Sequence, residues 1–286
     1  MRFKKGIDIL FQRTNIGFVF WFFFGILSTL LFYQPFEQPI FEDRAYLLYM
    51  SQVVYRGDAL YEATTFGYTP LSTIIVGYVM KVGSLLSLNT ILSARIIGLF
   101  VYGVLCGSFF VLCKSVFHRR IGTLIACVLF CGLGYIQIVS SINAEPKLWV
   151  LLFSILGIHF YNKNHWFFVG LFFSFAAMSW HVAVISLFVS AVMLPWKSKT
   201  WFSSVYKLML GVIAGILPVL CYLQLTNGWL DFWNQAVVRK LIVEGDVVGE
   251  SPFYWFKRSI YPYFLVEPLH FVFGFLGVFL LSLIHI

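Results

Sequence analysis

Charged residues are scarce in this chain. Only 11% of its 286 residues are Asp, Glu, Lys or Arg, whereas 60% are hydrophobic and 20% are aromatic. A water-soluble domain of this length does not need so much apolar surface, so the composition excludes an ordinary soluble protein and indicates a polytopic membrane protein. The net charge of +8 comes from basic residues spread between apolar runs and in polar loops. Since no block of Lys and Arg is interleaved with aromatic residues, we expect no nucleic-acid partner.

Motifs of soluble enzymes are also lacking. The sequence contains no Gly-rich phosphate loop, no GxSxG elbow and no HExxH. Its cysteines form no CxxC pair and no cluster with histidine at zinc-site spacing, and all fall in apolar runs or at their ends. We interpret them as small apolar residues inside helices. They are Cys106, Cys113, Cys127, Cys131 and Cys221.

The apolar runs predict a bundle of transmembrane helices in a plasma (inner) membrane. A basic N-terminal segment, MRFKKGIDILFQR, precedes the run Asn15–Tyr33. That run is long enough to span, since roughly 20 helical residues cross the hydrocarbon core. No small-residue cleavage site follows it, so we do not interpret it as a signal peptide. The basic residues place the N-terminus in the cytoplasm, and the first span therefore leads to the extracytoplasmic side.

A long first extracytoplasmic loop, residues 34–93, is expected to follow. The next clean span, Ala94–Cys113, ends at Lys114 and the pair Arg119-Arg120, which the positive-inside rule places in the cytoplasm. The number of crossings is then consistent only if the apolar stretch Pro70–Leu88 does not cross. We therefore predict that Pro70–Leu88 is an interfacial or re-entrant helix.

The remaining runs complete the expected topology. We predict an outward span Ile121–Val139, a short external loop Ser140–Lys147, a returning span Leu148–Tyr161, two short helices with an outer turn within Trp166–Leu194, an outward span Leu208–Thr226, and a later external segment 227–267. The whole chain, 1–286, is expected to be one transmembrane module that is incomplete at its C-terminus. Its last six residues, 281–286, match the translation of a common sequencing adapter, so we interpret them as an artefact.

Carboxylates stand at two of the predicted external positions. Glu42 and Asp43 lie where the chain has just left the first span, and they open the polar stretch Phe41–Leu71. Glu145 lies in the second external loop, before a proline. Acidic groups held at a membrane surface beside apolar helices suggest chemistry on a lipid-borne substrate.

Several elements in this order resemble the GT-C class of integral-membrane glycosyltransferases. The resemblance is to the family 39-like branch that includes the protein O-mannosyltransferases and the aminoarabinose-to-lipid A transferases, and it covers Asn15–Leu280. The elements that carry it are Glu42-Asp43, Tyr46, Gly57–Tyr61, Pro70-Leu71, Arg95, Glu145-Pro146 and Gly228–Lys240.

The resemblance implies an all-α polytopic bundle with interfacial helices in its first extracytoplasmic loop. It also implies transfer of a sugar from a polyprenyl-phosphate donor to a protein, lipid or glycan acceptor at the extracytoplasmic face. Two departures stand out. The acidic pair is Glu-Asp rather than Asp-Glu, which leaves open the carboxylate that does the chemistry. His181 follows Trp180 where many relatives carry a lysine.

The residue types suit this reaction. An acceptor hydroxyl needs a general base, for which the candidates are Glu42, Asp43 and Glu145. The departing phosphate needs cations. The candidates to bind it are Arg44, Arg95, His181, Arg239, Lys240, Lys257 and Arg258. No cofactor is required by the sequence, although a divalent cation bridging carboxylates and phosphate is compatible with it.

Other interpretations stay open at this point. A secondary transporter would also be polytopic and apolar, with its site on broken helices near the midplane. An envelope polysaccharide polymerase or ligase is a further alternative. At the level of single residues, Glu145 could pair with Lys147, His181 could be an interior histidine, and Tyr46 and Tyr61 could be packing residues.

Overall fold

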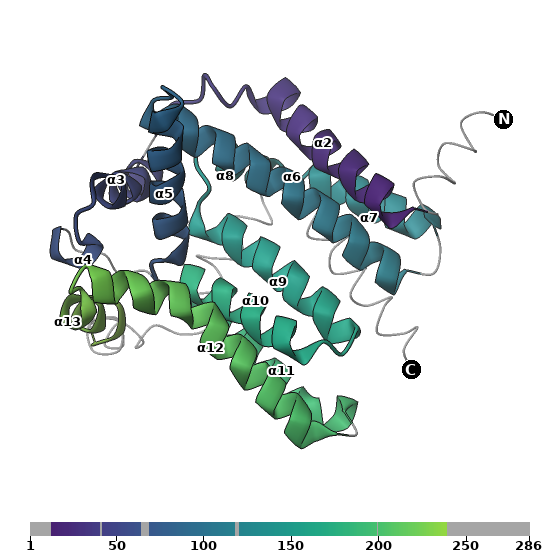
Figure 1. Cartoon of the computed structure of the whole chain (residues 1–286). Coiled ribbons are helices and arrows are strands. Elements are labelled where there is room, and N and C mark those ends of the chain that lie inside the picture. The colour runs from purple at the N-terminus through teal and green to yellow at the C-terminus, as the bar shows by residue number, and fades with distance from the viewer. Residues whose placement is uncertain (1–12, 41, 64–68, 118–119, 199, 239–286) are drawn as a thin grey trace, which may run out of the picture. The chain divides into compact units, whose positions relative to one another are not determined.

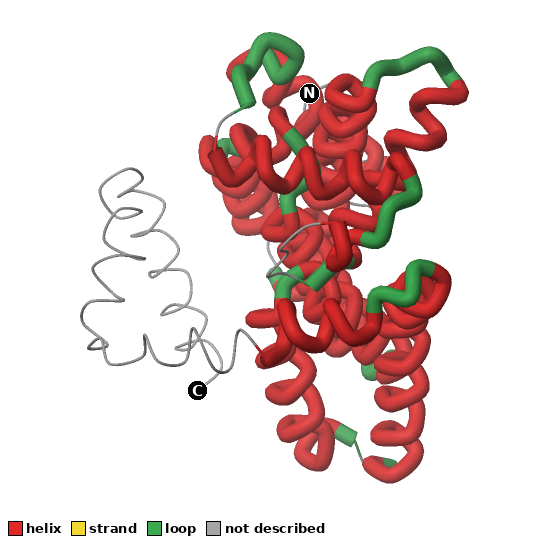
Figure 2. The backbone as a smooth tube through the Cα atoms, turned by 90° about the vertical axis from the view of Figure 1, so that its left-hand side faces the viewer, coloured by secondary structure: helices red, strands yellow, loops and turns green. Residues whose placement is uncertain are grey.

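Helices make up all the regular structure that the computed structural model describes (Figure 2). It describes residues 13–40, 42–63, 69–117, 120–198 and 200–238, and no strand occurs among them. In chain order the helices are α2 (Thr14–Tyr33), α3 (Glu42–Arg56), α4 (Leu60–Ala63), α5 (Leu71–Leu85), α6 (Thr90–Val116), α7 (Arg120–Cys131), α8 (Gly134–Ile142), α9 (Pro146–Asn162), α10 (Trp166–Ser179), η1 (His181–Ala183), α11 (Val184–Lys197), α12 (Trp201–Leu225), α13 (Trp229–Phe232) and η2 (Trp233–Val238). The predicted all-helical class is confirmed.

The chain divides into two compact units, Met1–Ala236 and Val237–Ile286. The first contains every helix from α2 to α13, and Figure 1 shows their arrangement. The second unit falls almost entirely outside the described residues, as does the expected artefact at 281–286.

Three of the helices, α2, α6 and α12, are long and apolar enough to cross a membrane. They correspond to the spans predicted at Asn15–Tyr33, Ala94–Cys113 and Leu208–Thr226, and they support a membrane protein. One boundary was wrong. Helix α12 begins at Trp201, so Lys207 lies inside the helix rather than before the predicted span Leu208–Thr226. A lysine near a helix end is tolerated because its long stem lets the ammonium group reach the interface.

The run predicted as one span, Ile121–Val139, is instead two helices. Helices α7 and α8 meet at an angle of 51°. The carbonyl oxygen of Cys131, at the break, accepts a hydrogen bond from the Tyr102 hydroxyl at 2.9 Å and another from the Gln137 side chain. A backbone group released from the helical ladder must find a partner when it is buried, and these side chains provide it.

The break predicted within Trp166–Leu194 is confirmed. Helix α10 ends at Ser179, a short 3-10 turn follows at His181–Ala183, and α11 continues from Val184. The turn therefore falls at Trp180 and His181, in the middle of the long apolar run Trp166–Leu194.

Helix α5 has the properties expected of an interfacial helix. Its 15 residues, Leu71–Leu85, extend about 22 Å at 1.5 Å per residue, less than the roughly 30 Å of a hydrocarbon core. In Figure 1 it runs across the ends of α6, α9 and α12 rather than alongside them.

Four of the cysteines are buried, which agrees with their interpretation as packing residues, whereas Cys221 is exposed.

Acidic residues are confined to one end of this bundle within the described ranges. All seven Asp and Glu residues among the described ranges belong to segments at the ends where α2 and α12 finish and where α3 and α9 begin. We call this the acidic end; its members are Glu37, Glu42, Asp43, Asp58, Glu62, Glu145 and Asp231. The opposite end, where Lys114 on α6 donates to Thr14 on α2 at 2.7 Å, carries basic residues only in the described ranges. These are Arg13, Lys114, Arg120, Lys163, Lys197 and Lys207.

Helices α10 and α12 approach each other at backbone distance. The motif Gly211-x-x-x-Gly215 on α12 faces α10, which contributes Gly170. A Cβ atom at Gly211 would overlap the carbonyl oxygen of Phe167, and one at Gly215 would lie 2.8 Å from that of Leu171. Small residues at this spacing allow close helix packing in membranes, where association depends on van der Waals contact. The α10–α12 pair thereby holds the end of α12 in place near the acidic end.

We expect Gly211→Ala to destabilise the protein by about 1–3 kcal/mol, because the new methyl group meets backbone that cannot move aside without separating the helices. Gly122→Ala on α7 is the matched control, since the nearest atom to its added Cβ is 3.8 Å away. Thermal unfolding of the purified variants in detergent measures both. Equal melting temperatures for the two variants would contradict the prediction.

Candidate functional site

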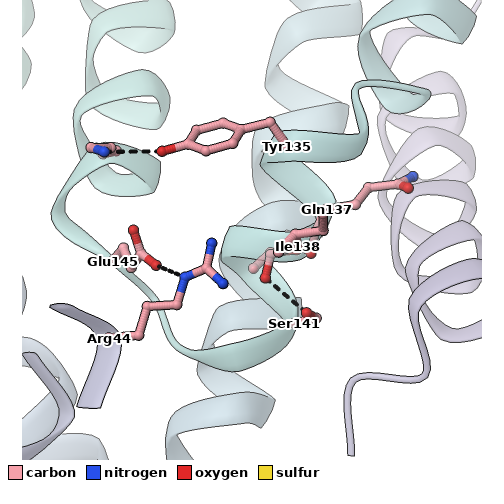
Figure 3. A network of polar contacts seen from close by, with 8 residues as sticks. Arg44, Tyr135, Gln137, Ile138, Ser141 and Glu145 are labelled. Carbon is pink, nitrogen blue, oxygen red and sulfur yellow. Dashed lines mark hydrogen bonds and ion pairs between the residues drawn. The ribbon is translucent and has the colours of Figure 1, made fainter. Parts of the chain in front are cut away.

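Two carboxylate-bearing segments meet at the acidic end. The Nε atom of Arg44, in the first turn of α3, donates to Oε1 of Glu145 at 2.8 Å, although the two residues are 101 positions apart. The Glu145 side chain is 7% exposed and that of Arg44 is 25% exposed. Figure 3 shows the guanidinium of Arg44 directed into the space between α8 and α9. The ion pair therefore brings the start of α3 next to the turn before α9.

Local sequence explains how Glu145 is presented. It is the N-cap residue of α9, and Pro146 occupies the first helical position, where its missing N–H is no loss. The turn before it is held against α6 at Gly98, where a Cβ atom would overlap the carbonyl oxygen of Ser140 and approach Asn143 to 3.2 Å. The predicted external loop Ser140–Lys147 is thus only three residues long, Asn143–Glu145, and it is fixed by backbone packing.

Arg95 anchors the chain that enters α3. It is buried near the start of α6, and its two terminal nitrogens donate to the carbonyl oxygens of Phe36 and Gln38. These contacts fix the segment between α2 and α3 and so help to place Arg44. The guanidinium is occupied by backbone in this structure, and its role as a phosphate ligand stays a prediction.

A second polar pair lies beside the first. The Nζ atom of Lys147, in the first turn of α9, donates to the Tyr135 hydroxyl of α8 at 2.9 Å. It also lies 5.7 Å from the ring centroid of Tyr135 and 5.8 Å from that of Trp180. Trp180 directly precedes His181 at the α10–α11 break, so the region of His181 is brought to the same site. Lys147 thus contacts aromatic residues of two other elements.

The later polar segment contacts the first one. The Tyr222 hydroxyl, near the end of α12, accepts from the backbone N–H of Leu60 at 3.1 Å, and the Gln235 side chain donates to the carbonyl oxygen of Tyr61 at 2.6 Å. Tyr61 is 2% exposed and its ring lies 5.3 Å from that of Phe232. Burial raises the pKa of the Tyr61 phenol, and nearby Tyr222 and Tyr46 raise it further. These contacts agree with the interpretation of Tyr61 as a packing residue.

The other predicted site residues are placed unequally. Glu42 and Asp43 are the first two residues of α3, next to Arg44, but their side chains lie outside the described part of the structure. The predicted cations of the later segment also lie outside it: Arg239, Lys240, Lys257 and Arg258. Among the described residues no group of three or more His, Cys, Asp or Glu could hold a metal ion.

Three contributors were not predicted from sequence. Lys147 could have been found, because it follows Glu145-Pro146 in the same short loop. Tyr135 and Trp180 carry no such signal, since each is one aromatic residue among many in an apolar run.

An apolar groove of 410 Å³ between α5 and α12 was not predicted either. Ile74, Tyr78, Pro218 and Tyr222 contribute to its lining.

The fold and the site together define an all-helical protein with membrane-spanning character and a polar site at one end of its bundle. Comparisons with family profiles, with curated proteins and with solved structures find no match to this chain.

Proposed function

We propose that this protein transfers a sugar from a polyprenyl-phosphate donor to an acceptor hydroxyl at the extracytoplasmic face of the membrane. The observation that carries the proposal is the Arg44–Glu145 ion pair, which joins the acidic start of α3 to the acidic turn before α9. A reaction that uses a carboxylate base and a phosphate leaving group needs acids and cations side by side, within reach of the bilayer. The acidic end provides this combination.

The proposed reaction uses the residues as follows. A carboxylate of Glu42 or Asp43 removes the proton of the acceptor hydroxyl while its oxygen attacks the anomeric carbon. The bond from that carbon to the phosphate oxygen breaks, and polyprenyl phosphate leaves with the bonding electrons. The Nε atom of Arg44 donates to Glu145. Within the described residues its two terminal amino groups make no hydrogen bond. They are suitable donors to the negative charge that develops on the phosphate.

The apolar groove between α5 and α12 supports a lipid-borne donor. Its lining is almost entirely apolar, and its volume of 410 Å³ is in the range of small-molecule sites, roughly 300–1,000 Å³. Tyr222 in its lining also contacts α4, so the groove adjoins the acidic end. Part of an isoprenoid chain would bury its surface there while the phosphate stays at the polar site.

The division of charge supports the proposed orientation. Basic residues favour the cytoplasmic side, and the end opposite the site carries only basic charge in the described ranges. We therefore propose that the site faces the extracytoplasmic side of a plasma (inner) membrane and that the N-terminus is cytoplasmic. We propose no cofactor, and a divalent cation is an addition that the assay below can test.

The experiment that tests the function is a transfer assay in proteoliposomes. The purified chain is incubated with radiolabelled polyprenyl-phosphate sugars and candidate acceptors, with and without Mg²⁺ or a chelator. We expect label to leave the carrier and appear on an acceptor, which empty liposomes cannot bring about. Retention of label on every carrier tested would contradict the proposal.

A secondary transporter is the second candidate, and one observation favours it. The helix pairs α7–α8 and α10–α11 are both interrupted, and transporters build midplane sites on interrupted helices. A pocket of 500 Å³ at the first break includes Ser28 and Gln137 in its lining. Substitution of Glu42 and Asp43 separates the two functions, because transport should survive it and sugar transfer should not.

A further inference from the structure

The pocket of 500 Å³ at the α7–α8 break has no part in the proposed reaction. Its lining comes from the second half of α2, between Phe24 and Tyr33, and from the end of α7, the break itself and the start of α8. The bordering part of α2 extends about 13.5 Å at 1.5 Å per residue. The volume is in the range of small-molecule sites, roughly 300–1,000 Å³. We call this cavity the break pocket.

The Gln137 side chain contributes an acceptor to the break pocket. It is 3% exposed, and its Nε2 atom donates to Ser28 Oγ at 3.0 Å and to the carbonyl oxygen of Cys131. These partners fix the orientation of the amide, because the Cys131 carbonyl can only accept and the Ser28 hydroxyl already donates to the carbonyl oxygen of Gly25 at 2.8 Å. The remaining atom, Oε1 of Gln137, accepts no hydrogen bond from the described residues, and it is open to the pocket rather than enclosed by packed side chains.

The chemistry of the lining selects the head group of a ligand. An amide oxygen that is removed from water without a partner is unfavourable, and only a group that carries a proton can satisfy it. Tyr33 lines the same pocket, and its hydroxyl makes no hydrogen bond within the described residues. A ligand hydroxyl can donate to Gln137 and accept from Tyr33. A carboxylate cannot donate, and no described residue of the lining carries a charge that would attract one.

The break pocket opens sideways, where lipid would surround the bundle. Two residues of its lining, Phe32 on α2 and Val128 on α7, are 76% and 53% exposed, and α2 is long and apolar enough to span. A ligand would therefore enter from the bilayer. Tyr33 is the last residue of α2, at the level where tyrosine favours the membrane interface. The hydroxyl of the ligand would lie there, and its hydrocarbon would extend toward Phe24.

We propose that the break pocket binds a neutral lipid alcohol from the bilayer. Its hydroxyl group donates to Oε1 of Gln137 and accepts from the Tyr33 hydroxyl, and its hydrocarbon lies against Phe24 and Val128. The site is separate from the one proposed for sugar transfer, since in Figure 3 the Gln137 side chain points away from the Arg44–Glu145 pair and toward α2. A bound ligand would contact α2, α7 and α8 together and so stabilise the bend between α7 and α8.

Photolabelling tests the inference without any sugar transfer. The purified full chain, in nanodiscs of phosphatidylcholine, is illuminated with hexadecanol that carries a diazirine in its chain, and labelled peptides are identified by mass spectrometry. We expect saturable labelling of the second half of α2 and of the segment around the α7–α8 break. Unlabelled hexadecanol should compete, whereas hexadecane, which lacks the hydroxyl group, and ionised palmitate should not.

Variants of the lining test the assigned contacts. Gln137→Leu and Tyr33→Phe each remove one hydrogen-bonding group, so each should raise the half-saturating concentration of hexadecanol about 3- to 10-fold. Val128→Trp fills the pocket from its exposed side and should abolish saturable labelling. The matched controls are Tyr206→Phe on α12 and Val19→Trp on α2, which change exposed residues of the same types outside the lining and should leave labelling unchanged.

Three results would overturn the inference: wild-type labelling in Val128→Trp, competition by hexadecane equal to that by hexadecanol, or equal competition by palmitate. Gln137 also holds the Cys131 carbonyl, so Gln137→Leu could fail to fold. In that case Tyr33→Phe and Val128→Trp decide the question through the same titration. None of these measurements depends on sugar transfer, so the proposed function and this inference can fail independently.

Discussion

Removing both carboxylates at the start of α3, with Glu42→Gln and Asp43→Asn together, is expected to reduce sugar transfer by about 10²- to 10⁴-fold. This is the contribution usual for a general base, which takes the acceptor proton in the transition state. The carrier should still bind, because the proposed phosphate ligands are untouched. Initial rates of label transfer from the polyprenyl-phosphate donor measure the effect.

The single variants identify the base within the pair. The variant that lacks the base should lose activity and also the rise of rate with pH that a base produces as it ionises. The other should change the rate less and keep that rise. Glu62→Gln on α4 is the matched control, since Glu62 is an exposed carboxylate of the same segment. Transfer at the wild-type rate by the double variant would remove these carboxylates from the mechanism and direct attention to Glu145.

Breaking the Arg44–Glu145 pair is expected to have the second largest effect. Arg44→Ala should lower transfer by about 100-fold or more, in the range seen when a donor to a developing oxyanion is removed. It should also lower the melting temperature, because the largely buried carboxylate of Glu145 loses its ion pair. Initial rates and thermal unfolding of the same preparations measure the two effects separately.

An exchange of the two charges distinguishes chemistry from structure. In the double variant Arg44→Glu with Glu145→Arg an ion pair can form again, so part of the lost stability should return. Transfer should not return, because the terminal amino groups that face the phosphate in our mechanism have moved to the other segment. Recovery of both properties together would show that the pair serves the fold alone.

The helices could be predicted from the sequence where the physical signal was local. Apolar runs of span length predicted α2, α6 and α12, and the count of crossings predicted that Pro70–Leu88, which contains α5, does not cross the membrane. The α7–α8 break could not be predicted in this way, because the bend depends on side chains from other positions, Tyr102 and Gln137, that donate to the released carbonyl of Cys131. The early start of α12 was missed because the predicted span began directly after the charged residue Lys207.

Composition and charge order by themselves determined that this is an all-helical membrane protein with carboxylates at two of its helix ends. Apolar runs and the positions of basic residues are local features of the sequence, so the sequence alone can reveal them. Only the tertiary structure decided that Arg44 and Glu145 form a pair, that Arg95 binds backbone, and that Lys147 lies between Tyr135 and Trp180. These contacts depend on how helices pack, and packing brings together residues whose separation in the sequence carries no information about their distance in space.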